Sequence, residues 1–160
     1  MSKLYSLTEL QEQINMNPDQ WRPLVLTNGC FDLLHVGHVR YLQTAKALGK
    51  TLVVGVNSDH SVSRIKPEKP GFPSRPIIPE TQRAEVLSAL DAVDAVIIFP
   101  ETTATELIKA FQPDIYAKGG DYTIESLPEA ETVQAYNGNI KLITIEVPTS
   151  TSKIIQKILG

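Results

Sequence analysis

Two histidines, His35 and His38, are the residues in this sequence best placed to do chemistry, because they flank Gly37 in a turn between a strand and a helix. The apolar run at residues 24–27 predicts the strand, and apolar residues spaced three apart from residue 39 onward predict the helix. A helix start leaves backbone N–H groups unpaired, and the helix dipole adds partial positive charge there. Gly37 lacks a Cβ, which lets a phosphate approach the backbone. We therefore expect a phosphate chain to bind here, with two imidazoles facing it.

The elements that must position these histidines alternate along the chain. Apolar runs predict strands at residues 24–27, 51–56, 94–99, 113–117 and 140–147. Helical patterns are found at residues 6–15, 39–48, 79–90, 102–111 and 150–159. Such alternation indicates a parallel sheet with helices on both faces. The expected fold is α/β: a Rossmann-like, doubly wound, five-stranded parallel sheet in a single domain at residues 23–160, preceded by a helical appendage at residues 1–22.

The composition narrows the class of partner. Of 160 residues, 42% are hydrophobic and 21% are charged, which is typical of a soluble globular domain. The net charge of −3 and the pI of 5.6 argue against nucleic-acid and membrane partners, both of which favour a basic face. The N-terminus has no apolar core of a signal peptide, and no run reaches the ~18 apolar residues of a membrane span. We expect a cytoplasmic protein with a small-molecule partner.

Cys30 is the single cysteine, which excludes an intramolecular disulfide and a cysteine-based metal cluster and fits a reducing compartment. It lies inside the histidine turn, but the spacing places no base beside it, so packing is favoured over a nucleophilic role. Neither the dinucleotide fingerprint Gly-x-Gly-x-x-Gly nor the Walker phosphate loop occurs. A nucleotide would therefore bind through another turn.

Polar residues cluster after four of the predicted strands, at residues 28–38, 57–64, 118–122 and 149–152. In an open parallel sheet the ligand crevice lies beyond the carboxyl ends of the strands, so these clusters are expected to meet at one edge. The turn at Gly119 and Asp121 could lie under a base or ribose. The helix start at residues 150–152 could hold the outer phosphates of a triphosphate, and a plain helix cap is an equal alternative.

The segment at residues 59–79 shows no clear strand or helix, and loops of that length are usually functional or disordered. It is locally basic, and we interpret Arg64, Lys66 and the nearby Arg83 as a phosphate clamp. Prolines occur at every third position from residue 67 to residue 79, which is the period of polyproline II. This spacing predicts a stiff lid or a partner-facing strip, and a plain proline-rich linker is the alternative.

Taken together, these motifs resemble the cytidylyltransferase-like nucleotidyltransferase superfamily and, within it, the D-glycero-β-D-manno-heptose 1-phosphate adenylyltransferase family. The similar segments are residues 27–32, 35–38, 56–59, 64–66, 75–76, 82–83, 118–122 and 150–155. The resemblance extends from about residue 24 to residue 159. It implies transfer of AMP from ATP to heptose 1-phosphate, with release of pyrophosphate and formation of ADP-heptose for cell-envelope glycans such as lipopolysaccharide.

The resemblance also implies roles for individual residues. Catalytic roles fall to His35, His38, Lys66 and Arg83. The nucleotide would contact Asn28, Gly29, Cys30, Phe31, His35, Gly37, His38, Arg83, Gly119, Asp121, Ser150, Thr151 and Ser152. The substrate-binding residues would be Asp32, Asp59, Arg64 and Lys66, with Arg64 and Lys66 contacting either the acceptor or the triphosphate. Mg²⁺ is expected to arrive with ATP rather than at a dedicated metal site, with Asp32 as the candidate carboxylate, and a homodimer is expected.

Two features depart from that family. Residues 66–75 form a longer link than usual, which leaves the acceptor open, and residues 150–152 read Ser-Thr-Ser where the family has Ser-Thr-Thr. One alternative is a cytidylyltransferase acting on glycerol 3-phosphate or a related phosphate. That family's Arg-Thr-Glu-Gly is replaced here by Ile-Glu-Val-Pro at residues 145–148, which favours the adenylyl transfer. The other alternative is a catalytically silent nucleotide-binding module.

Overall fold

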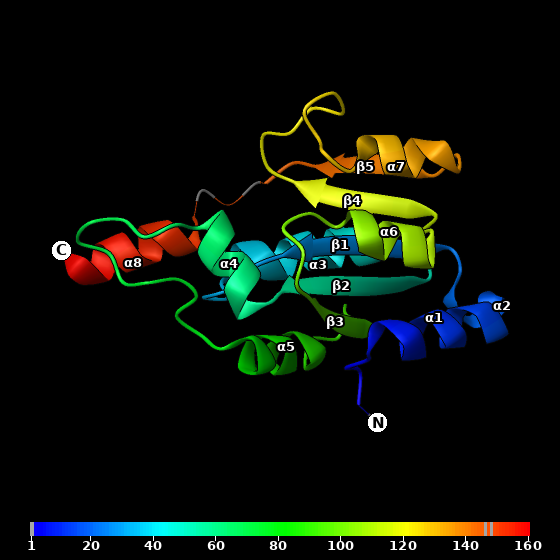
Figure 1. Cartoon of the computed structure of the whole chain (residues 1–160), viewed down its shortest axis with the longest axis horizontal. Helices are drawn as coiled ribbons and strands as arrows, with labels where there is room; N and C mark the ends of the chain where they lie inside the picture. Colours follow the sequence, from blue (N-terminus) through cyan, green and yellow to red (C-terminus); the bar gives the residue numbers. More distant parts are fainter. Residues whose placement is uncertain (1, 146, 148) are drawn as a thin grey trace.

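Five parallel strands form the centre of the protein in the computed structural model, which describes residues 2–145, 147 and 149–160 (Figure 1). The strands are β1 (Leu24–Gly29), β2 (Thr51–Asn57), β3 (Ala95–Phe99), β4 (Ile115–Gly119) and β5 (Asn139–Ile143). Their order in the sheet is β3-β2-β1-β4-β5, and every neighbouring pair is parallel. The predicted Rossmann-like α/β fold is confirmed.

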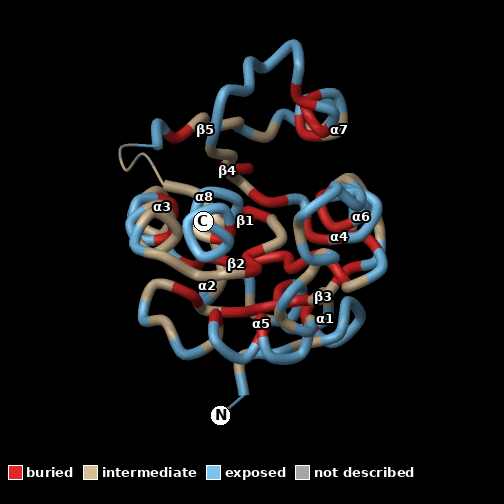
Figure 2. Tube along the Cα trace, turned by 90° about the vertical axis from the view of Figure 1, so that its left-hand side faces the viewer, coloured by how far each residue is buried: buried red, intermediate tan, exposed pale blue. Residues whose placement is uncertain are grey.

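Helices cover both faces of this sheet. They are α1 (Leu7–Met16), α2 (Pro18–Trp21), α3 (Val36–Lys46), α4 (Asp59–Ile65), α5 (Glu80–Ser88), α6 (Thr105–Phe111), α7 (Ala130–Ala135) and α8 (Thr151–Leu159). One core cluster packs α1, α6 and α7 on the sheet, and a second packs α3 and α5 on the other face. Figure 2 shows the buried residues concentrated in the strands and on the inward sides of the helices. In the described part of the chain, no helix has the length and apolar character needed to cross a membrane.

Strand burial is complete in β2 and least at the β5 edge, whereas the other edge strand, β3, is buried at four of its five positions and is bridged by Leu4. All seven residues of β2 are buried, because β2 lies between two strands and under helices on both faces. A strand covered on both faces reads as a continuous apolar run, as residues 52–54 do. The edge strand β5 instead has exposed residues at two of its five positions.

The N-terminal segment is packed onto the main core. Helix α1 begins with a capping box, in which Ser6 Oγ accepts from the Glu9 backbone N and Glu9 Oε2 accepts from the Ser6 backbone N. Leu10 and Ile14 are buried in the same cluster as Phe111 of α6. The segment therefore shares its apolar core with the sheet.

Three short helices, α2, α4 and α7, were not predicted from the sequence. The interpretation of residues 59–79 as irregular was wrong for residues 59–65, where Ser58 caps α4 by accepting from the Ser61 backbone N at 3.2 Å. The remaining residues, 66–79, contain neither helix nor strand. The predicted fifth strand is shorter than expected and ends at Ile143; Glu146 and Pro148, at the end of that prediction, lie outside the described residues.

Because the strands are parallel, their carboxyl ends lie at one edge of the sheet. Helices α4 and α8 and the loop at residues 66–79 gather at that edge (Figure 1). The polar segments that follow β1, β2, β4 and β5 begin there. The fold thus brings residues from distant parts of the sequence to one place.

Candidate active site

A pocket of about 420 Å³ opens at the carboxyl edge of the sheet. Among the residues predicted to form a site, those that line it are Asn28, Gly29, Cys30, Phe31, Asp32, His35, Gly37, His38, Lys66, Gly119, Ser150, Thr151 and Ser152. Four other predicted residues, Asp59, Arg64, Arg83 and Asp121, are described by the structure but do not line this pocket. The structure therefore unites the histidine turn with the start of α8 and sets several charged residues apart from them.

The two histidines of the turn each present the same ring nitrogen to the pocket. His35 caps α3, and its Nδ1 accepts from the Gly37 backbone N at 3.1 Å. His38 Nδ1 accepts from the His35 backbone N at 3.2 Å. When one nitrogen of a neutral imidazole accepts, the other carries the proton. Both Nε2 atoms are therefore N–H donors, and neither is paired with another described residue.

The two rings are neutral at neutral pH. Their centroids lie 3.9 Å apart with an angle of 31° between the planes. Burial and the neighbouring His35 lower the pKa of His38 to about 4, and burial lowers the pKa of His35 as well. The histidines thus offer oriented N–H dipoles rather than positive charges.

Gly37 is required by the ring of His35. A Cβ at Gly37 would lie 2.9 Å from both Cε1 and Nδ1 of the His35 imidazole. The position that a Cβ would take is therefore filled by the capping ring, while Gly37 itself lines the pocket, and the approach of a phosphate to it stays a prediction. A larger residue would displace the imidazole from its cap.

The start of α8 faces the histidine turn. Ser150 caps α8 by accepting from the Lys153 backbone N at 3.1 Å, and Thr151 Oγ1 donates to the Leu33 carbonyl at 3.2 Å. A Cβ at Gly37 would lie 3.8 Å from Cγ2 of Thr149. Two helix N-termini, those of α3 and α8, therefore meet at one pocket, and each adds partial positive charge there.

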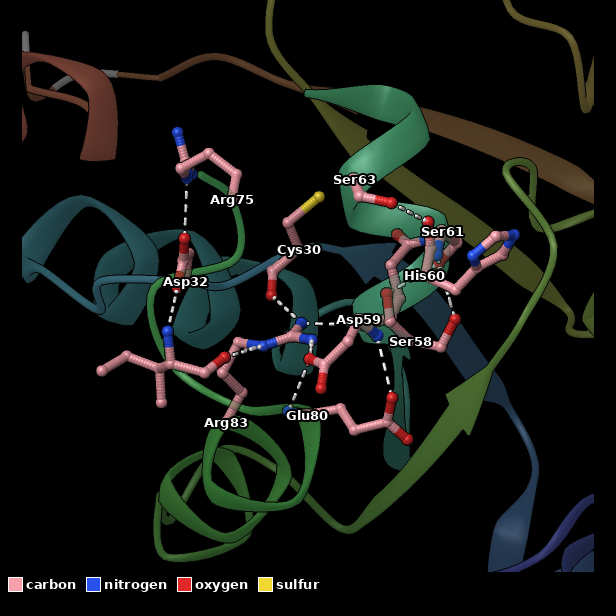
Figure 3. A network of polar contacts seen from close by, with 12 residues as sticks. Cys30, Asp32, Ser58, Asp59, His60, Ser61, Ser63, Arg75, Glu80 and Arg83 are labelled. Carbon is pink, nitrogen blue, oxygen red and sulfur yellow. Dashed lines mark hydrogen bonds and ion pairs between the residues drawn. The ribbon is translucent and has the colours of Figure 1, made fainter. Parts of the chain in front are cut away.

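The carboxylate of Asp32 is fully used within the protein (Figure 3). It accepts from Arg75 Nε at 2.7 Å, from the Ile77 backbone N at 2.9 and 3.0 Å, and from the Ile78 backbone N at 2.9 Å. Its side chain is completely buried. Asp32 thereby fastens residues 75–78 to the histidine turn, and these bonds occupy both of its oxygens.

Arg83 is buried away from the pocket, with 1% of its surface exposed. It donates from Nε to the Ile78 carbonyl at 2.8 Å and from Nη1 to the carbonyls of Cys30 and Asn57 at 2.6 and 2.8 Å. Its Nη2 donates to Asp59 Oδ1 at 2.9 Å. Four of its five N–H donors are thus paired with protein acceptors (Figure 3). This geometry supports a role in joining the ends of β1 and β2 to α5.

Asp59 is likewise hydrogen-bonded to other residues of the protein. Its Oδ1 also accepts from the Glu80 backbone N at 2.8 Å, and its own backbone N donates to Glu80 Oε1 at 2.8 Å. The first turns of α4 and α5 are therefore linked reciprocally. Arg64 lies in the last turn of α4 and is exposed.

Two cations that line the pocket, Arg75 and Lys118, were not predicted as site residues. Asp32 holds Nε of Arg75, and the outer end of the guanidinium points away from that carboxylate (Figure 3). Burial lowers the pKa of Lys118, and the Glu129 carboxylate opposes this shift. The sequence did contain a weak signal for each residue: Arg75 lies in the basic loop, and Lys118 precedes the turn after β4.

Phe31 and Cys30, which lie between β1 and the histidines, have surroundings that indicate packing roles. Phe31 has a φ of 49°, in the left-handed region that bulky residues rarely adopt, and its ring lies 5.5 Å from that of His38. Burial raises the pKa of the Cys30 thiol, which disfavours the thiolate. These contacts support a packing role for Cys30 and a role for Phe31 in holding His38.

The fold and the place of the pocket define a Rossmann-like α/β protein with its candidate site at the carboxyl edge of a parallel sheet, and comparison with known proteins gives the family. The model of the cytidylyltransferase-like family matches residues 26–158. The chain therefore belongs to the cytidylyltransferase-like family.

Among its relatives is the bifunctional protein HldE of Citrifermentans bemidjiense, which is 49% identical over 159 residues. HldE of Geobacter metallireducens is 47% identical over 158 residues. Each alignment covers 99% of this chain but 32% and 31%, respectively, of the relative. The chain thus spans about a third of the length of these relatives.

Two solved structures are similar to this chain in fold. The lipopolysaccharide core biosynthesis protein from Thermoplasma volcanium GSS1 is 31% identical with a TM-score of 0.60, and the match covers 78% of this chain and 97% of that one. Pantoate-beta-alanine ligase from Francisella tularensis, solved with beta-gamma ATP and beta-alanine, has a TM-score of 0.60 at 13% identity, covering 95% of this chain and 69% of that one. The second match shows a shared fold alone.

Proposed function

We propose that this protein transfers AMP from ATP to a sugar 1-phosphate, namely heptose 1-phosphate, releasing pyrophosphate and forming ADP-heptose. The observation that carries the proposal is the pair of Nε2–H donors on His35 and His38, which are unpaired among the described residues; the two histidines line one pocket together with the N-terminus of α8. Membership of the cytidylyltransferase-like family supports nucleotidyl transfer. The sequence resemblance to heptose 1-phosphate adenylyltransferases supports ATP and the acceptor.

The proposed reaction needs no strong general base. An oxygen of the acceptor phosphate, already an anion, attacks the α-phosphorus of ATP in line. A new P–O bond forms while the bond from the α-phosphorus to the oxygen that bridges it to the β-phosphorus breaks, and pyrophosphate leaves with that electron pair. The protein must therefore supply orientation and stabilisation of negative charge.

The residues of the pocket fit these two tasks. The Nε2–H groups of His35 and His38 donate to phosphoryl oxygens as their negative charge grows, without the repulsion that two charged rings at this separation would feel. The open N–H groups of α8 and the Ser152 hydroxyl hold the outer phosphates. Lys66 and Arg75 line the same pocket and provide cations for the acceptor phosphate.

Mg²⁺ fits this site as a companion of the nucleotide. Asp32 is the one carboxylate among the described residues that line the pocket, and its oxygens are occupied by Arg75 and by backbone N–H groups. In the described part of the chain, no group of three or more metal-ligating side chains comes together. Mg²⁺ would therefore be held by the phosphates of ATP, where it neutralises their charge.

We also propose that the protein acts as a cytoplasmic homodimer without nucleic-acid or membrane partners. The acidic composition and the sequence resemblance support this proposal. The family match begins at residue 26, which supports residues 23–160 as the transferase domain and residues 1–22 as an addition to it.

Pyrophosphate release tests the proposed function. ATP and CTP are each assayed with heptose 1-phosphate, other sugar 1-phosphates and glycerol 3-phosphate. We expect the highest kcat/KM for ATP with heptose 1-phosphate. Release confined to CTP with glycerol 3-phosphate would replace the proposal with the cytidylyltransferase alternative. Nucleotide binding without release from any acceptor would favour the silent module.

A further inference from the structure

Tyr116 of β4 is a fully buried side chain that is hydrogen-bonded to a residue of the pocket. Its hydroxyl donates to Oδ1 of Asn28, at the end of β1, at 2.5 Å. The parallel register pairs Tyr116 with Leu26, so the phenol leans two residues along the strand direction to reach Asn28. Asn28 itself lines the pocket. This bond therefore joins the apolar core to the ligand-facing surface.

The bond fixes which end of the Asn28 amide faces a ligand. A phenol has one proton to donate, and an amide has one accepting oxygen and one donating NH₂ group. Since Oδ1 takes the phenol proton, the NH₂ group occupies the opposite end. Among the described residues, the single side-chain nitrogen or oxygen that is both buried and unpartnered is Glu129 Oε1. Asn28 Nδ2, which has no protein acceptor there, therefore reaches accessible space in the pocket.

Tyr116 remains a donor because its phenol does not ionise. Burial, and then the negative charge of Glu129, raise the pKa of its hydroxyl far above the usual value. Glu129 is itself buried, and its Oε2 accepts from the Ala104 backbone N at 3.0 Å. Turning the Asn28 amide around would break this bond: the NH₂ group would then donate to the phenol oxygen, and the phenol proton would have to turn to the carboxylate of Glu129.

The surroundings of the amide favour a negatively charged ligand oxygen. Lys118 follows Tyr116 by two residues on β4, so the two side chains leave the same face of the sheet, and Lys118 lines the pocket. An amide NH₂ group beside an ammonium group presents donors alone. The matching ligand atom is an anionic acceptor, which in a nucleotidyl transfer is a phosphoryl oxygen.

We propose that Tyr116 is a positioning residue, which fixes the Asn28 amide as a donor to a phosphoryl oxygen of the nucleotide or of the acceptor. The proposal rests on the proposed function, which supplies the phosphoryl groups. It adds one detail to that function: the Tyr116 hydroxyl, which does not touch the substrate, sets the orientation of the Asn28 amide, which does.

Tyr116→Phe removes this hydroxyl, and Tyr136→Phe provides the matched control. The Tyr136 hydroxyl donates to the Pro113 carbonyl at 2.8 Å, and Tyr136 does not line the described pocket. Each variant thus loses one phenol hydrogen bond in a packed region. We expect Tyr116→Phe to lower kcat/KM about 10-fold and Tyr136→Phe to change it less than about twofold. Equal effects of the two variants would overturn the proposal.

A double-mutant cycle with Asn28→Ala separates positioning from simple structural support. If Tyr116 acts through Asn28, then Tyr116→Phe has no further effect on kcat/KM in the Asn28→Ala background, while it still lowers Tm. If the fold-losses of kcat/KM in the two single variants instead multiply in the double variant, the inference is overturned. This result can occur while the wild type releases pyrophosphate normally, so it is distinct from a failure of the proposed function.

Asn28→Asp tests the direction of the amide. Tyr116 can still donate to one carboxylate oxygen, which leaves the other oxygen, and its negative charge, facing the pocket. We expect a larger loss of kcat/KM than for Asn28→Ala, and equal or higher activity would contradict the donor role. A rise in KM for ATP places the phosphoryl group on the nucleotide, whereas a rise in KM for the sugar 1-phosphate places it on the acceptor.

Discussion

The carboxyl edge of the sheet contains two polar regions that look alike in the sequence but differ in how their hydrogen bonds are used. The arginine network consists of Asp32, Asp59, Arg75, Glu80 and Arg83 (Figure 3). The histidine edge consists of His35, His38 and residues 150–152. In the network, Asp32 and Arg83 pair with protein groups almost completely. In the histidine edge, two Nε2–H groups and the start of α8 face the pocket.

Under the proposed function, free hydrogen-bonding capacity, rather than formal charge, distinguishes a binding group from a structural one. Buried polar groups are nearly always paired, so a paired arginine is already accounted for by the fold. Arg75 belongs partly to each region, because Asp32 holds its Nε while its outer nitrogens remain directed away from that carboxylate. The network therefore stabilises the edge of the sheet at which the histidines lie.

The largest effect that separates the two regions is expected for His38→Ala. Loss of a transition-state donor should lower kcat by about 10²- to 10³-fold while leaving Tm nearly unchanged. Pyrophosphate release and thermal unfolding measure the two quantities. His60→Ala, an exposed histidine of α4 that does not line the described pocket, is the control and should keep normal turnover. Normal turnover in His38→Ala would refute its role.

The opposite pattern is expected for Arg83→Met in the arginine network. The carbonyls of Cys30, Asn57 and Ile78 would each lose a donor, so we expect a loss of roughly 3 kcal/mol in stability and a fall in Tm of about 6–12 °C. The KM for ATP of the folded fraction should change little. Arg40→Met, at an exposed position on α3, should leave Tm unchanged. A normal Tm with a strongly raised KM would instead make Arg83 a phosphate ligand.

The sequence was sufficient to predict the order of elements, the parallel sheet and the meeting of the histidine turn with the start of α8. Continuous apolar runs such as residues 52–54 identify buried strands, and parallel strands place their carboxyl ends together. Helices α2, α4 and α7 were missed because they are short and their residues show no clear apolar period. Packing against neighbouring elements, rather than propensity, explains why such short helices form.

The sequence could not assign Arg75 and Arg83 to their different roles. Both are basic residues near one loop, and their hydrogen-bond partners come from the ends of β1 and β2, more than twenty residues earlier in the chain. Arg83 lies on α5, which packs on the sheet and buries its side chain, whereas Arg75 lies in the loop at residues 66–79 and lines the pocket. Tyr116 likewise reads as an ordinary core aromatic until the direction of its hydroxyl is known.

A smaller effect concerns the pH dependence of stability. The pKa of His38 falls to about 4 in the folded protein, from about 6.5 in an unfolded chain. Between these values the unfolded chain binds more protons, so stability should be complete above pH 6.5 and should fall as the pH drops toward 4. His38→Gln should flatten this part of the Tm profile, whereas His60→Gln should not. An unchanged slope in His38→Gln would show that His38 is not the group responsible.

The smallest expected effects distinguish the roles of two serines, Ser150 and Ser152, in the histidine edge. Ser150 Oγ is used as the cap of α8, so Ser150→Ala should lower stability by about 1 kcal/mol. The Ser152 hydroxyl belongs to the pocket, so Ser152→Ala should raise the KM for ATP about threefold with little change in Tm. Calorimetry and steady-state kinetics measure both variants. If Ser152→Ala affected Tm alone, Ser152 would be part of the cap rather than a ligand.

A crystal structure with a non-hydrolysable ATP analogue tests the central claim most directly. We predict that phosphoryl oxygens lie within hydrogen-bond distance of Nε2 of both His35 and His38, and that the outer phosphates lie against the first N–H groups of α8. A triphosphate bound instead to the guanidinium of Arg83, with the two imidazoles left without a phosphate, would contradict the account.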